Sequence, residues 1–203
     1  IFYDEVQFTK NDWRNRNRIS TPTGIQWLTI PTNGSITQSI DDVTTAGSRW
    51  QQKHWNTLVT CYSKAPFFSK YRSFFEDFYL AHTWANLSAL NRYLIVHISM
   101  DFLGIKTKFS DSREYESHGT GHEKLLSLLQ SAGAEYYLSG PAARSYIHAE
   151  DYERCGIELH WKDYSCYPEY HQLHEPFCHN VSILDLLFNT GDAAPDFIWS
   201  FHR

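Results

Sequence analysis

The sequence lacks any apolar run long enough to cross a membrane, and its cysteines form no CxxC pair. A transmembrane helix needs about 20 consecutive apolar residues, so no membrane span is predicted. The four cysteines lie far apart, which favours reduced thiols in a cytoplasmic protein over a disulfide framework. No signal peptide is visible either. The chain begins inside a predicted strand without an initiator Met, so we expect upstream residues to be missing.

An overall positive charge is missing as well. The 23 acidic residues outnumber the 18 lysines and arginines, which gives a formal net charge of -5. General nucleic-acid binders are usually basic, so that class is excluded, although a local basic patch at residues 10–18 is not. Aromatic residues, in contrast, make up 16% of the chain. The 203 residues fit one domain, whose core we expect to be built largely from Phe, Tyr and Trp.

The first 19 residues combine an apolar start with a polar cluster around Trp13. A strand that ends in such a cluster places polar groups at the end of a sheet, where open α/β folds bind ligands. The alternating Arg14, Arg16 and Arg18 would share one face of an extended chain and could hold a phosphate or carboxylate. A solvated surface loop is the alternative. The binding residues expected here are Gln7, Lys10, Asn11, Arg14, Asn15 and Arg16.

The hydrophobic periodicity predicts an α/β fold. The spacing of apolar residues at 50–101 predicts three helices, and residues 105–161 alternate as strand, helix, strand, helix, strand. This alternation predicts parallel strands with right-handed crossovers. We therefore expect a single domain over residues 1–203, with a mostly parallel sheet flanked by helices, a helical insertion at 50–101 and a short helix or tail at 192–203. Individual strands are expected at residues 25–30, 36–40, 105–109, 135–138 and 157–161.

Seven sequence blocks occur in order along nearly the whole chain. They are DEVQF at 4–8, NDWRNRN at 11–17, WLTIP at 27–31, KHW at 53–55, KAPFF at 64–68, YLSGPA at 137–142 and SILDLLFNTG at 182–191. Together they resemble the WbqC-like protein family. That family carries an earlier strand and helix, with a Gln-Pro and an aromatic-rich turn, before the point where this chain begins. The resemblance therefore implies one WbqC-like domain that lacks this element.

The resemblance also implies a pathway. Members of the family occur in gene clusters for lipopolysaccharide O-antigen and other surface polysaccharides, and they have been proposed to transfer glycine or another amino acid onto sugar amines. The resemblance thus implies a transferase of surface-glycan biosynthesis. Such an enzyme would form an amide between an amino acid and a nucleotide-linked amino sugar.

A predicted strand-to-helix turn follows Ser139. Free backbone N–H groups at the start of a helix can bind an anion. Gly140 allows a ligand to approach closely, and Arg144 lies one helical turn further on. A plain connection without a ligand is the alternative. Further along, Tyr164 lies in an irregular segment rich in tyrosine, which is suited to lining a pocket for a sugar or a flat ring.

His54 competes with Asp4 and Glu5 as the proton acceptor for an attacking sugar amine. His54 lies at the edge of a predicted helix, where a histidine is also often structural. Asp4 offers a carboxylate at a strand end. A covalent route through a cysteine is the alternative, but neither Cys61 nor Cys178, which is followed by His179, matches a family motif. Direct attack on a bound thioester or acyl adenylate needs only positioning and an oxyanion site.

The last part of the chain contains two groups of polar residues. The first group consists of the cysteines and histidines between residues 166 and 179. Their spacing matches no common zinc-binding pattern, so no metal is expected. The helix expected from Ser182 is apolar on most sides, so its Asp185 needs a partner, for which a cation of the opening cluster is the candidate. Asp185 would then be part of a site or a structural tie. The residues without zinc spacing are Cys166, His171, His174, Cys178 and His179.

Two alternatives to the transferase remain open. A non-catalytic protein that recognises a sugar nucleotide or docks a partner enzyme would use the same residues. An ATP-dependent amide ligase would activate a carboxylate as an adenylate, although no nucleotide motif is visible. The cofactor stays open between a CoA thioester, a carrier-protein thioester and ATP. The expected partners are a sugar nucleotide or amino sugar and a carrier protein, with no nucleic acid.

Overall fold

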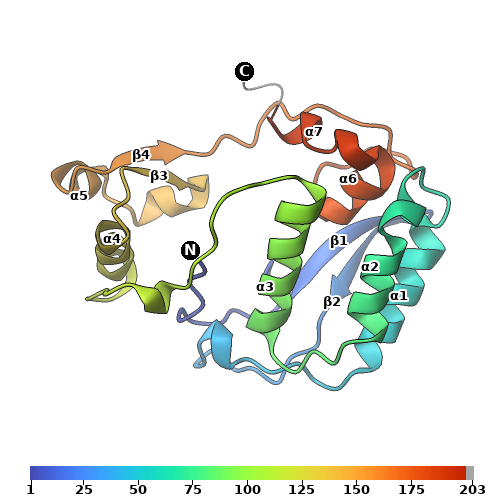
Figure 1. Cartoon of the computed structure of the whole chain (residues 1–203), viewed down its shortest axis with the longest axis horizontal. Coiled ribbons are helices and arrows are strands. Elements are labelled where there is room, and N and C mark those ends of the chain that lie inside the picture. Colours follow the sequence, from blue (N-terminus) through green and yellow to red (C-terminus); the bar gives the residue numbers. More distant parts are fainter. Residues whose placement is uncertain (200–203) are drawn as a thin grey trace. The chain divides into compact units, whose positions relative to one another are not determined.

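The computed structural model describes residues 1–199, and the chain forms two compact units (Figure 1). Unit 1 consists of residues 1–3 and 109–166. Within the described residues, unit 2 consists of residues 4–108 and 167–199. Each unit has its own sheet and its own apolar core. No helix among residues 1–199 is long and apolar enough to span a membrane.

Unit 2 is mainly helical and contains one antiparallel hairpin. Its two strands meet in a register that pairs Arg16 with Thr29 and Arg18 with Trp27. The long α1 packs against α2, and α2 packs against α6. The elements are β1 (Arg16–Thr21), β2 (Gly24–Thr29), α1 (Arg49–Tyr62), α2 (Phe68–Leu80), α3 (Leu87–His97), α6 (Ile183–Thr190) and α7 (Asp196–Trp199). Single turns lie at η1 (Ile40–Asp42), η2 (Ile98–Phe102) and η5 (Gly191–Ala193).

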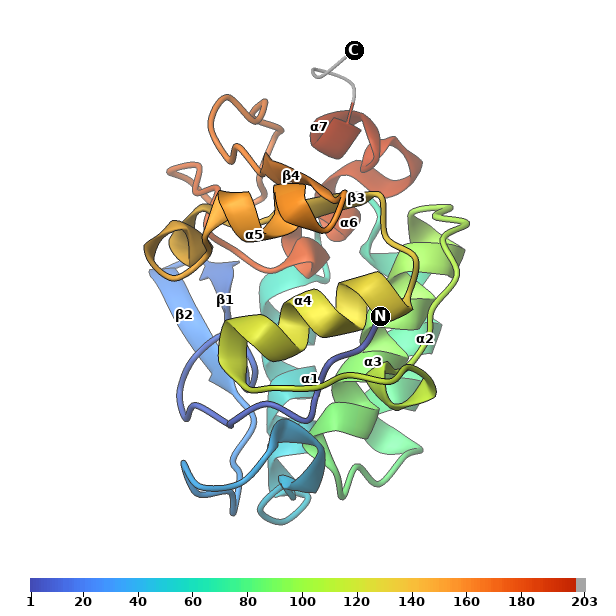
Figure 2. The ribbon, with the colours of Figure 1, turned by 90° about the vertical axis from the view of Figure 1, so that its left-hand side faces the viewer.

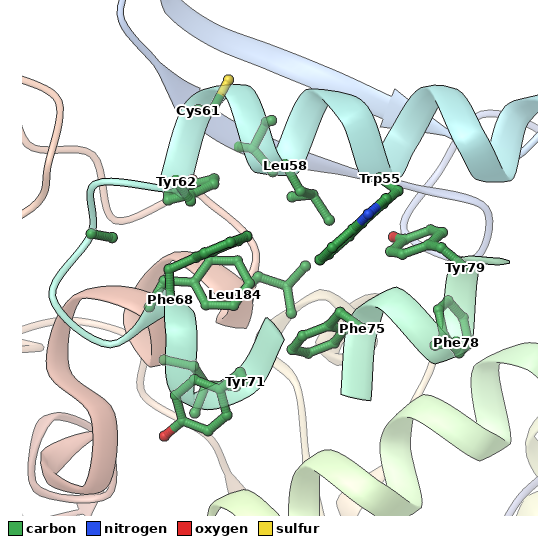
Figure 3. Packing of buried hydrophobic residues seen from close by; sticks show 14 of the residues in the cluster. Trp55, Leu58, Cys61, Tyr62, Phe68, Tyr71, Phe75, Phe78, Tyr79 and Leu184 are labelled. Atoms are coloured by element: carbon green, nitrogen blue, oxygen red, sulfur yellow. The ribbon is translucent and has the colours of Figure 1, made fainter. Parts of the chain in front are cut away.

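The core of unit 2 is aromatic, as the composition predicts (Figure 3). Helical spacing places the large side chains of α1 and α2 on the faces that meet. Phe188 of α6 is fully buried between them. Its ring centroid lies 5.2 Å from that of Tyr62 in α1, and 5.1 and 5.7 Å from those of Phe68 and Phe75 in α2. Phe188 therefore joins three helices.

The end of α6 is closed by a glycine that no other residue could replace without a shift. Gly191 follows the helix with φ +61°, and a Cβ there would lie 2.4 Å from the ring of Phe67. The backbone N–H of Phe67 donates to the carbonyl of Phe188 at 2.9 Å, so the start of α2 is held against α6. Gly191 is the C-cap residue of α6.

Unit 1 contains a parallel strand pair flanked by helices (Figure 2). Apolar residues of α4 and α5 share a core with the strand pair and with Ile157, and Tyr137 stacks on Tyr152 at 5.6 Å. Phe2 pairs in parallel with the segment at Asp111. The elements are η3 (Ser112–Glu114), α4 (Gly121–Ser131), β3 (Tyr136–Ser139), η4 (Pro141–Ser145), α5 (Ala149–Arg154) and β4 (Glu158–Trp161).

Several expectations from the sequence hold. The fold mixes helices and strands, the three helices expected within residues 50–101 are present, and a short helix lies in the described part of residues 192–203. A mostly parallel sheet is not confirmed. The described residues form two two-stranded sheets, and of these only β3–β4 is parallel. The single domain over residues 1–203 stays a prediction, and the last four of these residues lie outside the described part.

Three expected strands are wrong. The first is the strand expected at the start of the chain, where residues 1–9 form only isolated bridges at Phe2 and Gln7. Residues 36–38 form a turn, and Ser39 makes only an isolated bridge to Gln7. The side chains of Ser35 and Gln38 bind the backbone of this turn: the N–H of Thr37 donates to Ser35 Oγ at 3.3 Å, and the N–H of Ser35 donates to Gln38 Oε1 at 2.8 Å. Residues 105–109 are irregular. An alternating pattern forms a strand only where a partner strand takes up its backbone hydrogen bonds, and none pairs with this segment among residues 1–199.

The position of Phe188 predicts the largest loss of stability from a single truncation in unit 2. Replacing a buried Phe by Ala costs about 3–5 kcal/mol of the free energy of unfolding. Phe188→Ala should therefore lower this free energy by about that amount in urea unfolding. Leu80→Ala, at a side chain that is 45% exposed, is the matched control and should change it by less than about 0.5 kcal/mol. A Phe188→Ala loss no larger than that of the control would contradict this account.

Candidate functional site

The carboxyl ends of β3 and β4 bring four of the predicted binding residues together in unit 1. Ser139 ends β3, and its register partner Trp161 ends β4. Gly140 follows, and a Cβ built on it would lie 3.8 Å from the Tyr164 hydroxyl. The guanidinium of Arg144, in η4, lies 5.1 Å from the centroid of the Trp161 ring. We call these five residues the strand-end site.

The strand-end site presents a cation and two aromatic rings. Ser139 is buried, whereas Arg144 and Tyr164 are exposed. Within the part of the chain that the structure describes, Arg144 has no carboxylate partner and the Tyr164 hydroxyl makes no hydrogen bond. Guanidinium is a planar donor for phosphate or carboxylate. Trp161 is the member that sequence reasoning missed, although its place at the end of a predicted strand was a usable signal.

The arginines of the opening cluster are held by aromatic rings. β1 begins at Arg16, so Arg16 and Arg18 share one face of the strand, as predicted, and their guanidinium carbons lie 4.1 and 5.4 Å from the Trp27 centroid. Arg14 precedes the strand and forms an ion pair with Asp12. The shared face therefore includes two of the three arginines. Trp27 lies on the partner strand, which the alternation of arginines could not reveal.

The amides of the opening cluster bind backbone groups of unit 2. Asn15 is 2% exposed; its Oδ1 accepts the N–H of Asn11 at 2.9 Å, and its Nδ2 donates to the carbonyl of Ile30 at 3.0 Å. Asn11 has φ +62°, a conformation that Asn tolerates better than most residues. Gln7 Nε2 donates to the carbonyl of Ile36 at 2.5 Å, and Lys10 is exposed. A ligand-binding role for these four residues stays a prediction.

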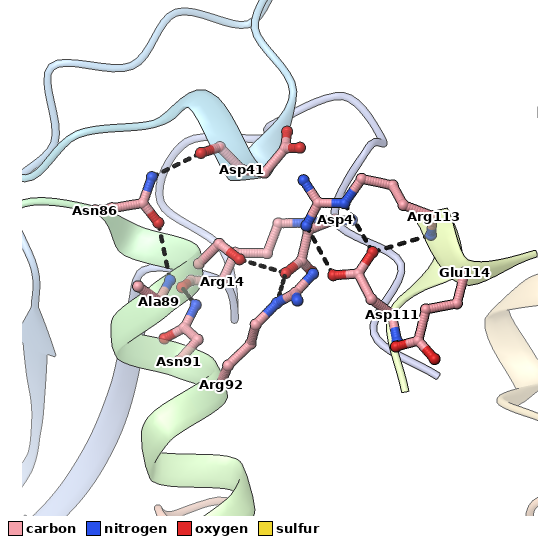
Figure 4. Close-up of polar contacts among 11 residues, drawn as sticks. Asp4, Arg14, Asp41, Asn86, Ala89, Asn91, Arg92, Asp111, Arg113 and Glu114 are labelled. Atoms are coloured by element: carbon pink, nitrogen blue, oxygen red, sulfur yellow. Dashed lines mark hydrogen bonds and ion pairs between the residues drawn. The ribbon is translucent and has the colours of Figure 1, made fainter. Parts of the chain in front are cut away.

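The carboxylate of Asp4 is anchored to α3 (Figure 4). Arg92 Nε donates to Asp4 Oδ2 at 2.7 Å, and the hydroxyl of Ser88 donates to the same oxygen. The carboxylate is 19% exposed. Nearby, Asn91 Nδ2 donates to the carbonyl of Arg14 at 2.9 Å, so α3 holds two points of the opening segment. Asp4 thus has a structural role, and its predicted proton-transfer role stays untested.

His54 lies inside the core of unit 2 rather than at its surface. Its Nε2 donates to the carbonyl of Thr29 at 3.1 Å, and its ring lies 5.2 Å from Trp50 and 6.1 Å from Tyr79. Burial lowers the pKa of His54 from 6.5 to about 4, an effect that the hydrogen bond to Thr29 partly opposes. The imidazole is therefore neutral at physiological pH and ties α1 to β2. Its catalytic role remains a prediction.

Asp185 is fully buried. The prediction that a cation of the opening cluster pairs with it is wrong. Instead, the hydroxyl of Tyr62 donates to Asp185 Oδ2 at 2.7 Å, and the hydroxyl of Tyr170 donates to Asp185 Oδ1 at 2.8 Å. Asn189 Nδ2 adds a third contact to Oδ1 at 3.3 Å. Burial and, after it, the nearby carboxylate raise the pKa of both phenols. The Tyr62 hydroxyl also accepts the N–H of Ser20 at 3.0 Å. Asp185 is therefore a tie between α6, α1 and β1.

The cysteines are free thiols. Burial raises the pKa of Cys61, which keeps this thiol protonated and weakens it as a nucleophile. The N–H of Cys178 donates to Gln172 Oε1 at 2.8 Å, and the ring of the adjacent His179 packs on Phe177 at 4.6 Å. Among residues 1–199, no group of three or more His, Cys, Asp or Glu side chains could hold a metal ion.

Unit 2 also contains a groove of about 660 Å³ that sequence reasoning missed. One wall is the end and turn of the β1–β2 hairpin, and the other is the polar face of α1. The usable signal was the helical spacing of polar residues from 49 to 60. We call it the α1 groove. Its lining residues are Thr21, Pro22, Thr23, Gln26, Arg49, Gln52, Lys53, Asn56, Thr57, Thr60 and Cys61.

Comparisons with known proteins agree with the seven sequence blocks. The model of the WbqC-like protein family matches residues 1–197. The uncharacterised protein Rv1507c of Mycobacterium tuberculosis is 42% identical over 200 residues, which cover 98% of this chain and 86% of that relative. No solved structure matches.

The buried tie at Asp185 predicts a specific loss of stability. A hydrogen bond to a charged group contributes about 1.5–3 kcal/mol. Tyr62→Phe keeps the ring but removes the hydroxyl, so we expect the free energy of unfolding to fall by about that amount. Tyr146→Phe, at an exposed tyrosine, is the control. A loss for Tyr62→Phe that equals the control in urea unfolding would show that the tie is not stabilising.

His54 predicts how stability depends on pH. The pKa of His54 is about 4 in the folded state against 6.5 as its ordinary value, so the unfolded state takes up the proton first as the pH falls. The contribution of the neutral imidazole is complete above pH 6.5 and declines toward pH 4, by about 2–3 kcal/mol. Urea unfolding at pH 7 and pH 4.5 should show a smaller acid-induced loss for His54→Gln than for the natural chain. Equal losses would refute this assignment.

Proposed function

The chain belongs to the WbqC-like protein family, and on this premise we propose that it is a transferase of surface-glycan biosynthesis, such as O-antigen assembly. The reaction forms an amide between the carboxyl group of an amino acid such as glycine and the amino group of a nucleotide-linked amino sugar. The family resemblance supports the pathway. The chemistry of the strand-end site supports the substrate class.

The observation that carries this proposal is the meeting of Arg144, Trp161 and Tyr164 at the carboxyl ends of two parallel strands. Open α/β folds bind their ligands at this edge. A guanidinium without a carboxylate partner suits the diphosphate of a sugar nucleotide. The exposed Tyr164 ring and the Trp161 ring beneath the guanidinium suit a flat base or the apolar face of a sugar.

The reaction needs an activated acyl donor. In the proposed step, the sugar amine attacks the carbonyl carbon of an aminoacyl thioester of CoA or a carrier protein, or of an adenylate made with ATP. A C–N bond forms, the C–S or C–O bond to the donor breaks, and the leaving thiolate or phosphate takes the electron pair. The amine loses one proton. Positioning of the two reactants supplies much of the rate enhancement in such a step.

Asp4 and His54 remain the proposed proton acceptors. Of the two, Asp4 has the more accessible side chain, with its carboxylate 19% exposed beside Arg92. His54 is buried against Trp50 and bound to Thr29. Asp4 is therefore the stronger candidate for contact with a substrate.

A non-catalytic sugar-nucleotide-binding protein is the second candidate. The observation that favours it is the composition of the strand-end site, whose members are a cation, two aromatic residues, Ser139 and Gly140, with no carboxylate or histidine among them. Such a set binds and orients a ligand, whereas a general base would have to come from elsewhere.

A transfer assay tests the proposal. Purified protein is incubated with nucleotide-linked amino sugars and either glycyl thioesters or glycine with ATP, and amide products are detected by mass spectrometry. Arg144→Ala should raise the KM for the sugar nucleotide about 10- to 100-fold, because it removes a charged hydrogen bond.

Arg154→Ala is the matched control, since this exposed arginine of unit 1 pairs with Asp151 away from the strand-end site. It should leave the KM within about twofold of the natural value. Absence of amide with every donor would count against the transferase. Sugar-nucleotide binding without turnover would favour the binding protein.

A further inference from the structure

The α1 groove is lined by positive charges that no acidic side chain of its lining neutralises. The charged side chains that line it are Arg49 and Lys53, one turn apart on α1, and no acid lines it. Neither cation forms an ion pair within residues 1–199. The first turn of α1 contains no acid either. Two like charges at this spacing repel each other, in a chain whose formal net charge is -5.

The rest of the α1 groove offers neutral hydrogen-bonding groups. Gln52 Nε2 donates to Asn56 Oδ1 at 2.8 Å, which orients both amides along the helix. The hydroxyls of Thr57 and Thr60 donate to helix carbonyls at 2.8 Å, so their oxygen lone pairs remain available as acceptors. Gln26 adds an exposed amide from the opposite wall. Such alternating donors and acceptors match the hydroxyl groups of a carbohydrate.

The length and volume of the groove fit an elongated ligand. Arg49 and Thr60 are separated by about 16 Å along the helix axis at 1.5 Å per residue. The volume of about 660 Å³ lies within the range of small-molecule sites. The cations occupy one end of this length, and Cys61, a buried thiol, lies at the other. One end therefore suits an anion, and the remainder suits a neutral polar body.

We propose that the α1 groove binds a phosphorylated carbohydrate, with its phosphate at Arg49 and Lys53 and its hydroxyls along Gln52, Asn56 and Thr57. Arg49 supplies a planar fork for two phosphate oxygens, and Lys53 supplies a point charge. Gln26 contacts the sugar from the hairpin wall. This site uses none of the residues of the strand-end site, and the inference does not rest on the proposed function.

Calorimetric titration of the full chain tests the proposal. The probes are glucose 1-phosphate, UDP-glucose, UDP, inorganic phosphate and free glucose. We expect both sugar phosphates to bind more tightly than inorganic phosphate, and free glucose not to bind. The two sugar phosphates distinguish the natural ligand. A higher affinity for UDP-glucose than for glucose 1-phosphate assigns the groove to a sugar nucleotide, and the reverse assigns it to a simple sugar phosphate.

Matched variants connect binding to the groove. The double variant Arg49→Gln with Lys53→Gln should weaken sugar-phosphate binding at least tenfold and reduce its salt dependence. Lys70→Gln with Arg72→Gln removes two exposed cations from the neighbouring α2 and should change binding less than twofold. Asn56→Leu should weaken the sugar phosphates but not inorganic phosphate. All five substituted positions are exposed on helices, and circular dichroism checks that each variant is folded.

Three results would overturn the proposal. The first is equal affinity of the natural chain and the Arg49→Gln, Lys53→Gln variant for every phosphorylated probe. The second is loss of binding in Arg144→Gln alone, which would place the ligand at the strand-end site. The third is binding of UDP as tight as that of UDP-glucose without any binding of glucose 1-phosphate, which would refute the carbohydrate part.

Discussion

The buried carboxylate of Asp185 is the interaction on which the arrangement of unit 2 depends. Burial of an ionised group costs several kcal/mol unless hydrogen bonds compensate for the lost water. Here the phenols of Tyr62 and Tyr170 and the amide of Asn189 donate to it, near the N-terminal end of α6, where the helix dipole favours negative charge. Because the Tyr62 hydroxyl also accepts the N–H of Ser20, one carboxylate sets the position of α6, α1 and β1 together.

This constraint extends to the surfaces with binding potential. Ser20 immediately precedes Thr21, and Tyr62 immediately follows Cys61; both neighbours line the α1 groove. The tie therefore holds the two walls of the groove at one end. The hairpin face that carries Arg16 and Arg18 over Trp27 belongs to the same strand pair, so it is held by the same network.

The polar residues divide into those used internally and those left available. Asn15, Asp4, His54 and Asp185 all bind groups of their own unit, and this use accounts for their burial or partial burial. Arg144 and the cations of the α1 groove make no ion pair within the described residues. A cation without a partner costs the fold little at the surface, and it keeps its hydrogen-bonding capacity for a ligand. The functional proposals rest on this second group.

The sequence by itself determined the local features. Apolar spacing predicted α1, α2 and α3, composition predicted the aromatic core, and chain order placed Ser139, Gly140 and Arg144 in one turn. These features depend on neighbours within a few residues, which a sequence displays directly. The tertiary structure decided the partners. Tyr62 and Asp185 are 123 positions apart, Trp27 reaches the arginines only through strand register, and His54 finds its hydrogen-bond partner in Thr29 of β2, 25 positions earlier. Such pairings depend on which elements pack together, and the spacing of residues in the sequence does not reveal this packing.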